Sequence, residues 1–308
     1  ALALDAALSL VPAVAAAATS LRRPPRLLWV ELARRLDRTQ RSTATLSRRG
    51  LLLVLATVVI AAALGWAVHA TAARHVAGWL VERAAIVLLL GQRDLFGGLG
   101  AVTRALGRGG LEGGRAALVE RFGGTGAASD SHGVVRLACA AGAERFVVVA
   151  VAPAFWYAAL GLAGLFASAA LLSLAGIAAA TRDRVEPFGR AAAIIRTLLL
   201  WLPARLGALL LVVASIVVPG GSPGAAIAVL RRDRLKFPDA LAGWPVAALA
   251  GGLGLALGGP PAAPAWIGDG KARADAGDLR RALYLLAVGC LLNAGMVAAL
   301  GVALAELS

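Results

Sequence analysis

Two groups of charged side chains in the second half of the sequence could bind an anionic substrate. Arg205 lies inside 198–218, a run that is otherwise apolar, and the run 231–236 carries four cations around Asp233. An arginine at the centre of a membrane costs about 2.5–3.5 kcal/mol on insertion scales, so it normally faces a polar cavity or a partner. Guanidinium groups bind phosphate through charge-assisted hydrogen bonds. Arg205 and the run 231–236 therefore predict a site for a phosphorylated substrate.

Each group also has a purely structural interpretation. If Pro203 begins the helix, Arg205 lies near a helix end and extends its guanidinium group to the membrane surface. The run 231–236, followed by Gly243-Trp244-Pro245, would then be a basic membrane anchor with an interfacial tryptophan. Both interpretations stay open at the level of the sequence.

The sequence does not show the patterns of common catalytic or metal sites. The histidines are scattered, the two cysteines form no CxxC pair, and no glycine-rich piece has the form GxxxxGK followed by Ser or Thr. A zinc site, a Ser-His-Asp arrangement and a P-loop are therefore not indicated. We expect no metal site and no stably bound cofactor.

The composition is typical of a membrane protein. Hydrophobic residues make up 59% and charged residues 16% of the chain, against about half and a quarter in soluble domains. The net charge of +14 lies in short connections between apolar runs, and aromatic residues make up 5%. This pattern indicates membrane topology rather than nucleic-acid binding. The expected partner is the lipid bilayer, and the expected location is a bacterial inner membrane crossed several times.

Apolar stretches alternate with arginine clusters, which are expected on the cytoplasmic side. The stretches are 51–90, 146–180, 197–230, 241–270 and 282–306. A crossing needs about 20 residues, so the first stretch holds two crossings with a turn near Arg74 and His75. The second holds a hairpin that turns near 161–164.

The remaining stretches give single crossings and shorter pieces. The third stretch crosses once, up to Val218, and the last crosses once. The piece after Val218 and the stretch 241–270 are expected to lie shallow or to re-enter the membrane. Residues 1–18 are expected to be a retained first helix.

The predicted fold is an all-α, polytopic membrane helical bundle with about five to seven crossings and re-entrant pieces. Residues 1–308 form one membrane domain. Within it, 91–145 is expected to be a small helical cytoplasmic insertion, because its apolar residues recur at helical spacing. Glycines at 107–114 and 123–126 are expected to break its helices.

A series of short motifs between 202 and 268 resembles one protein family. The motifs are Leu202-Pro203-Ala204-Arg205-Leu206, Arg232-Asp233, Pro238, Gly243-Trp244-Pro245, Gly258-Gly259-Pro260 and Trp266-Ile267-Gly268. Their order and spacing resemble the C-terminal half of the adenosylcobinamide-phosphate synthase family, the CobD/CbiB membrane proteins of cobalamin biosynthesis. Leu4-Asp5-Ala6 and the loop 93–143 are similar to the family too, so the resemblance spans nearly the whole chain.

The resemblance implies an ATP-dependent amide ligase that joins adenosylcobyric acid to aminopropanol or its phosphate. ATP and Mg would be used in the reaction, and the ligand would be a corrinoid intermediate or the phosphorylated linker. The substrate-binding residues expected from the motifs and the resemblance are Arg205, Arg232, Asp233, Arg234, Trp244 and Glu144. No catalytic residue is assigned.

Several polar positions of the family are not kept. Its Gly-Arg-Asp-Thr falls on 123–126, its Asn-Thr-Leu-Asp-Ser falls on 172–176, and of its Glu-Asn-Thr-x-Asp-Gly only Glu144 remains. Amide ligation through an acyl phosphate needs metal-bound ATP and oxygen ligands to hold it. The alternative is therefore a non-catalytic membrane paralogue with a regulatory role or a membrane protein partner. A transporter would need two structural repeats, and no repeat is evident.

Overall fold

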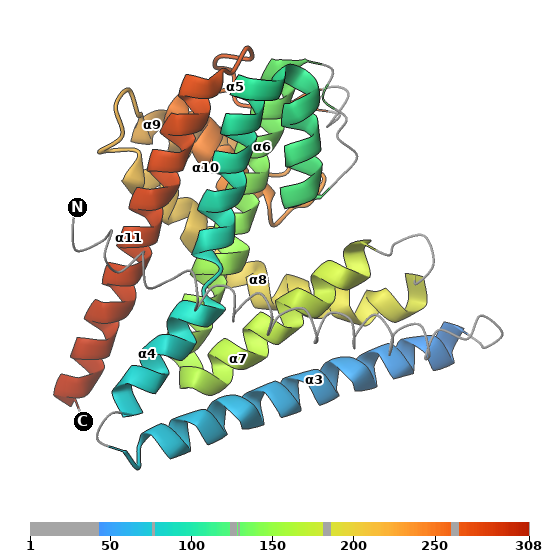
Figure 1. Ribbon diagram of the computed structural model, residues 1–308, viewed down its shortest axis with the longest axis vertical. Helices are drawn as coiled ribbons and strands as arrows, with labels where there is room; N and C mark the ends of the chain where they lie inside the picture. The colour runs from blue at the N-terminus through green and yellow to red at the C-terminus, as the bar shows by residue number, and fades with distance from the viewer. Residues whose placement is uncertain are drawn as a thin grey trace. The chain divides into compact units, whose positions relative to one another are not determined.

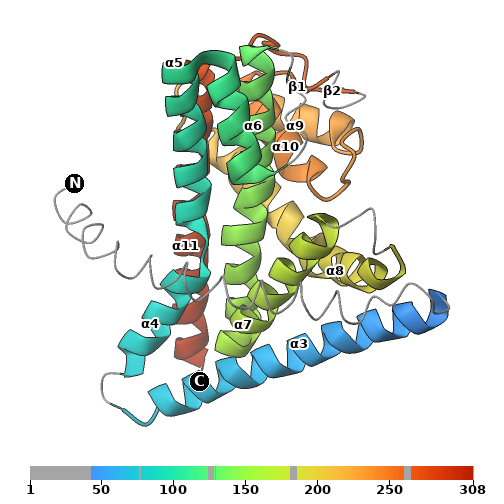
Figure 2. The same ribbon diagram turned by 45° about the vertical axis from the view of Figure 1, so that its right-hand side comes forward.

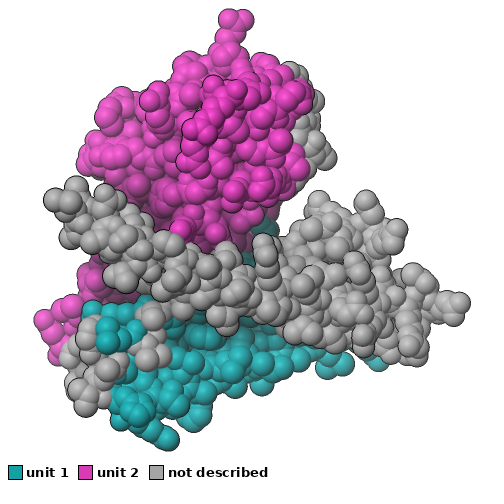
Figure 3. Space-filling view, viewed as in Figure 1, with its two compact units in different colours: residues 1–90, 159–199 teal, residues 91–158, 200–308 magenta. Residues whose placement is uncertain are grey.

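The computed structural model describes residues 43–75, 78–123, 128, 130–180, 186–259 and 265–307 (Figure 1). The expected first helix, 1–18, lies outside these residues. The described chain is helical except for turns, short connections and one small β-hairpin, which confirms the all-α prediction. It divides into two compact units, one made of 1–90 and 159–199 and the other of 91–158 and 200–308 (Figure 3).

Helices of membrane-spanning length occur along the described chain. Four segments are long and apolar enough to cross a bilayer: Gly50–Ala72, Ser131–Leu174, Ala193–Ala214 and Ala276–Ala303. The protein is therefore an all-α membrane protein, as predicted. The expected number of crossings includes residues 1–18 and stays a prediction.

The first unit contains α3 (Thr43–Ala72) and α4 (Gly78–Leu89). The turn after Ala72 is the one predicted near Arg74 and His75. Leu52, Val59 and Trp66 on α3 are each about two-thirds exposed, which suits a helix that faces lipid hydrocarbon. However, α4 has only 12 residues and includes Glu82 and Arg83. It is too short to make the second crossing predicted for 51–90.

The second unit begins with α5 (Gln92–Phe122), which folds back on itself at Gly110. Gly110 has φ 58°, a conformation that favours glycine because it has no Cβ. A Cβ at Gly114 would lie 2.5 Å from Leu106, and one at Gly98 would lie 3.0 Å from Phe122. The two halves of α5 therefore pack against each other, and the break predicted within 107–114 is confirmed. The cytoplasmic location of 91–145 stays a prediction.

Next come α6 (Ser131–Phe146), a π-helical turn (Val147–Val151) and α7 (Ala152–Ala180). α7 is kinked at Gly161, where the sequence predicted a turn. The π-turn carbonyls accept hydrogen bonds from outside their own helix: the Gly91 N–H donates to Val149 and the Asn293 amide donates to Ala150. Asn293 belongs to α11 (Ala276–Leu307), which lies beside α5 and α6 (Figures 1 and 2).

Two short helices follow the long helix α8 (Glu186–Ala214): α9 (Pro223–Asp233) and α10 (Gly243–Leu253). Each has 11 residues, so neither crosses a bilayer, as expected. α8 ends at Ala214, a few residues before the predicted Val218. Beyond α10 lies a hairpin that the sequence analysis did not predict, formed by β1 (Leu257–Gly258) and β2 (Trp266–Ile267).

The contact between α9 and α10 depends on a glycine. A Cβ at Gly251 in α10 would lie 2.5 Å from the Ala225 carbonyl oxygen and 2.7 Å from the Ala226 Cα, both backbone atoms of α9. Backbone cannot move aside as a flexible side chain can. The two helices therefore approach this closely only because position 251 lacks a side chain.

We predict that Gly251→Ala lowers the free energy of unfolding by about 1–3 kcal/mol, because the methyl group forces α9 and α10 apart. Gly224→Ala in α9 is the matched control, since a Cβ there meets nothing within 4 Å. Thermal unfolding of both variants in detergent, followed by circular dichroism, measures the difference. Equal melting temperatures for the two variants would contradict the close packing.

Candidate functional site

Asp233, the last residue of α9, forms ion pairs with Arg232 and Lys236. Its side chain is 1% exposed. The Arg232 Nε and Nη2 atoms each donate to one of its oxygens at 2.9 Å, and the Lys236 Nζ lies 2.7 Å from Oδ1. The Gly268 backbone N–H donates to Oδ2 at 2.9 Å. A carboxylate buried to this extent stays ionised only because both oxygens have charged partners and hydrogen bonds.

Arg232 links this carboxylate to the β-hairpin. Its Nη1 atom donates to Asp269 Oδ2 at 3.0 Å, so one guanidinium group bridges two carboxylates from distant parts of the chain. The hydrogen bonds from Arg232 are the main cause that lowers the pKa of Asp233 well below its usual range. The same hydrogen bond to Asp233 raises the pKa of Arg232. Both groups are therefore charged across the physiological range.

Trp244, near the start of α10, brings together two other cations. The Arg205 guanidinium carbon, from α8, lies 4.7 Å from the centre of the Trp244 ring, and that of Arg234 lies 5.0 Å from the same centre. Arg205 also stacks at 3.8 Å on Trp201, one turn earlier in α8. These distances are those of cation–π contacts. Three elements of the second unit thus meet at one indole ring, and we call Arg205, Arg234 and Trp244 the tryptophan cluster.

The structure corrects one interpretation of Arg205. α8 continues through Pro203, so Arg205 does not lie at the start of a helix. It lies within the candidate span Ala193–Ala214 and is half-buried. The helix continues because Pro203 removes one backbone donor but the surrounding turns keep their own hydrogen bonds. The charge of Arg205 is directed to the two indole rings instead.

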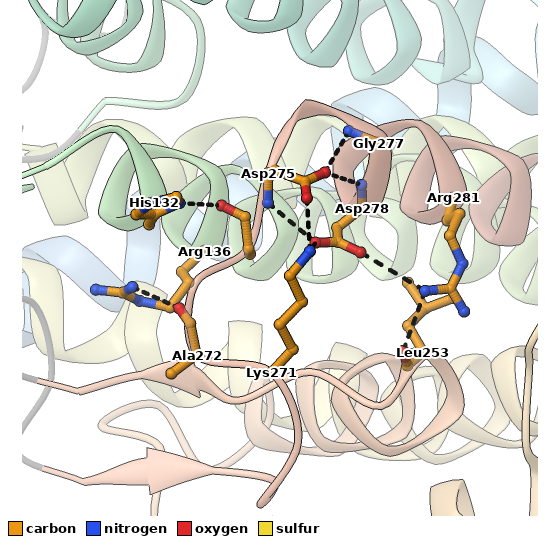
Figure 4. Close-up of polar contacts among 10 residues, drawn as sticks. His132, Arg136, Leu253, Lys271, Ala272, Asp275, Gly277, Asp278 and Arg281 are labelled. Carbon is orange, nitrogen blue, oxygen red and sulfur yellow. Dashed lines mark hydrogen bonds and ion pairs between the residues drawn. The ribbon is translucent and has the colours of Figure 1, made fainter.

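A second polar network fixes the start of α11 (Figure 4). The Lys271 Nζ lies 2.5 Å from Asp275 Oδ2 and 2.7 Å from Asp278 Oδ2. Arg281 lies 3.6 Å from the other Asp278 oxygen and donates to two backbone carbonyls at 219–220. The turn that follows α8 is thereby held to α11. The network holds the start of α11, which follows Gly268 by a few residues in the chain.

The segment before α11 is also fixed to α6 (Figure 4). The His132 Nδ1 lies 2.8 Å from the Ala274 carbonyl oxygen, and Arg136 donates to the Ala272 carbonyl at 2.8 Å. The Arg136 guanidinium carbon lies 5.1 Å from the centre of the Trp266 ring. His132 thus helps to hold the segment before α11 against α6.

The structure brings most of the predicted site residues into two neighbouring groups. Arg232 and Asp233 form the ion-paired group, while Arg205, Arg234 and Trp244 form the tryptophan cluster. Both groups depend on the run 231–236. Glu144 lies on α6 and is half-buried, and its role in substrate binding stays a prediction.

Sequence analysis did not single out Trp201, which stacks on Arg205, or Asp269, which pairs with Arg232. Trp201 could have been found, because it precedes Arg205 by four residues on the same helix face. Asp269 is 37 positions from Arg232, and no spacing rule joins the two. Within the described residues, no group of three His, Cys, Asp or Glu side chains is placed to hold a metal ion.

Comparison with known proteins places this chain in a family. The model of the family described as CobD/Cbib protein matches residues 1–286, which contain both groups of site residues. The chain belongs to the CobD/CbiB family. The resemblance seen in the sequence motifs is thereby confirmed.

Similar family members come from several bacteria. Each is called cobalamin biosynthesis protein CobD. The protein of Brucella anthropi is 35% identical over 267 residues, covering 84% of this chain and 82% of its own. That of a Sinorhizobium species is 32% identical over 275 residues, covering 86% and 85%. That of Rhodobacter capsulatus is 32% identical over 261 residues, covering 82% of each. No solved structure matches the chain.

We predict that Asp233→Asn lowers the free energy of unfolding by about 3 kcal/mol near neutral pH, because Arg232 and Lys236 lose their buried counter-charge. Asp269→Asn is the control. The Asp269 side chain is 75% exposed, so this variant should melt at nearly the same temperature as the native protein. Chemical or thermal unfolding in detergent at several pH values measures both.

The pH dependence follows from the lowered pKa of Asp233. The stability from this carboxylate is complete above its unfolded pKa of about 3.9 and is lost as the pH falls through the folded value. The difference between the native protein and Asp233→Asn should therefore be constant from pH 6 to 8 and shrink only below about pH 4. A difference that shrinks between pH 8 and 6 would contradict the assignment.

Proposed function

We propose that this chain is a multi-pass protein of the bacterial inner membrane that acts in cobalamin biosynthesis. The observation that carries the proposal is the family match over 1–286, together with relatives named cobalamin biosynthesis protein CobD that align over more than four-fifths of both chains. The four long apolar helices support the membrane location.

The proposed reaction is amide formation between adenosylcobyric acid and aminopropanol or aminopropanol phosphate. In this reaction a corrinoid carboxylate attacks the γ-phosphate of ATP and releases ADP. The amine of the linker then attacks the acyl phosphate, forms the amide and releases inorganic phosphate. ATP, the corrinoid carboxylate and aminopropanol phosphate carry phosphate or carboxylate oxygens, which suits a site built on arginines.

The proposed binding residues have different tasks. Arg205, Arg234 and Trp244 would contact the anionic ligand, and the pair Arg232–Asp233 would hold the run 231–236 in place. Glu144 is a further candidate on α6, with no task assigned beyond its place in the family motif.

The carboxylates of the two networks do not suit a resident magnesium ion. Mg²⁺ prefers free oxygen ligands in an octahedral arrangement. Asp233 and Asp269 are paired with Arg232, and Asp275 and Asp278 are paired with Lys271. Magnesium would therefore reach this protein as part of the ATP complex, and no step is assigned to a metal bound by these residues.

Ligation can be measured directly with purified protein in detergent. We expect adenosylcobyric acid, aminopropanol phosphate and Mg-ATP to give the amide, detected by mass spectrometry, with one ADP released per amide. Arg234→Ala should reduce the rate about tenfold or more, because a charged hydrogen bond to phosphate is lost. Full-length protein that binds these substrates but releases neither ADP nor amide would contradict the ligase assignment.

A non-catalytic membrane paralogue is the second candidate function. It is favoured by the lost polar positions at 123–126 and 172–176 and by the paired state of the network carboxylates.

A deletion strain separates a biosynthetic enzyme from a non-catalytic paralogue. In a medium that makes growth depend on cobalamin, the enzyme predicts growth with added cobinamide but none with cobyric acid. Reintroducing the gene should restore growth on cobyric acid. Normal growth of the deletion strain on cobyric acid would contradict the enzymatic role and favour the paralogue.

A further inference from the structure

The cations of the run 231–236 are of two kinds. Arg232 and Lys236 contact the buried carboxylate of Asp233, and Arg232 also contacts Asp269. Arg234 turns away from these carboxylates toward Trp244. Arg232 and Lys236 are thus neutralised by carboxylates, whereas, within the described residues, Arg234 keeps an unpaired positive charge.

Arg205 and Arg234 have no carboxylate within ion-pair distance in the part of the chain that the structure describes. Their hydrogen bonds go to nearby backbone carbonyls: Arg205 Nη1 donates to Trp201, and Arg234 Nη1 donates to Arg231 at 2.8 Å and to Leu230 at 3.4 Å. Backbone carbonyls carry only partial charge, so they offset a full cation in part. In each arginine, Nε and Nη2 remain as further donors.

Two unneutralised guanidinium groups at one ring are costly unless an anion joins them. Both guanidinium carbons lie within 5.0 Å of the Trp244 ring centre. They are therefore at most about 10 Å apart, and like charges at such a separation repel. The indole ring holds them by cation–π attraction, which is worth about 0.5–2 kcal/mol per contact. It does not cancel their charge. A phosphate dianion that reaches both groups would offset both charges and accept hydrogen bonds from both.

We propose that Arg205 and Arg234, positioned by Trp244, bind one phosphate monoester, and that Arg232 takes no part in this binding. The inference rests on the proposed function in naming the phosphate as the group that the cluster recognises. Binding itself needs neither ATP nor ligation. The phosphate could belong to a soluble phosphomonoester, such as aminopropanol phosphate, or to a lipid headgroup, because Arg205 lies within a candidate span.

Titration of delipidated full-length protein in a neutral detergent tests the site. Inorganic phosphate and aminopropanol phosphate are titrated by calorimetry, and retention of phosphatidic acid is measured separately by mass spectrometry. We expect Arg205→Ala and Arg234→Ala each to weaken binding about tenfold or more. Arg205→Lys and Arg234→Lys keep the charge and should weaken it less, because an ammonium group lacks the planar fork that binds phosphate through two bonds.

Arg231→Ala is the matched control. Arg231 lies in the same run and loses the same charge, but its side chain is exposed and is not part of the tryptophan cluster. We expect the phosphate affinity of the Arg231→Ala variant to differ from that of the native protein by less than about twofold, as for a screened surface charge.

The outcomes separate the two phosphate sources. Binding of the soluble phosphates that depends on both arginines supports a soluble ligand, and arginine-dependent retention of phosphatidic acid alone supports a lipid. The proposal is overturned if the native protein binds neither, or if Arg231→Ala weakens binding as much as Arg234→Ala. Arginine-dependent phosphate binding without amide formation would support the phosphate site and contradict the ligase assignment. Amide formation that neither arginine variant affects would support the ligase assignment and contradict the phosphate site.

Discussion

A carboxylate removed from water must have opposite charges and hydrogen-bond donors around it, and the buried Asp233 imposes this requirement on the second unit. Arg232, Lys236 and the Gly268 backbone N–H supply these partners. Since Gly268 follows the β-hairpin and Asp233 is the last residue of α9, the carboxylate fixes two distant segments relative to each other. The loop between α9 and α10 is thereby held in one shape.

This division of charge explains why neighbouring arginines have different tasks. With Arg232 and Lys236 held by Asp233, Arg234 is left beside Trp244, where Arg205 arrives from α8. Three segments contribute to the cluster, and each is fixed by contacts outside it. The turn after α8 is bonded to Arg281 of α11, and the loop between α9 and α10 is held by Asp233. α10 packs closely against α9 at Gly251. A binding group held by rigid elements loses little freedom when a ligand arrives.

Much of the fold could be predicted from the sequence because lipid sets a simple length requirement. Hydrophobic runs of about 20 residues gave the long helices, and glycines gave the breaks at Gly110 and Gly161. The site was predicted in part: Arg205 and the run 231–236 are conspicuous because charge beside apolar sequence is rare. The pairing of Arg232 with Asp269 was not predictable, since it depends on the hairpin that places them together.

The central claim is that Arg205 and Arg234 bind the same anion. A double-mutant cycle on the affinity for inorganic phosphate tests it most directly, with Arg205→Lys, Arg234→Lys and the double variant compared with the native protein. If the two arginines share one phosphate, the loss in the double variant will differ clearly from the sum of the two single losses. Strictly additive losses would show that they act independently and would contradict the shared site.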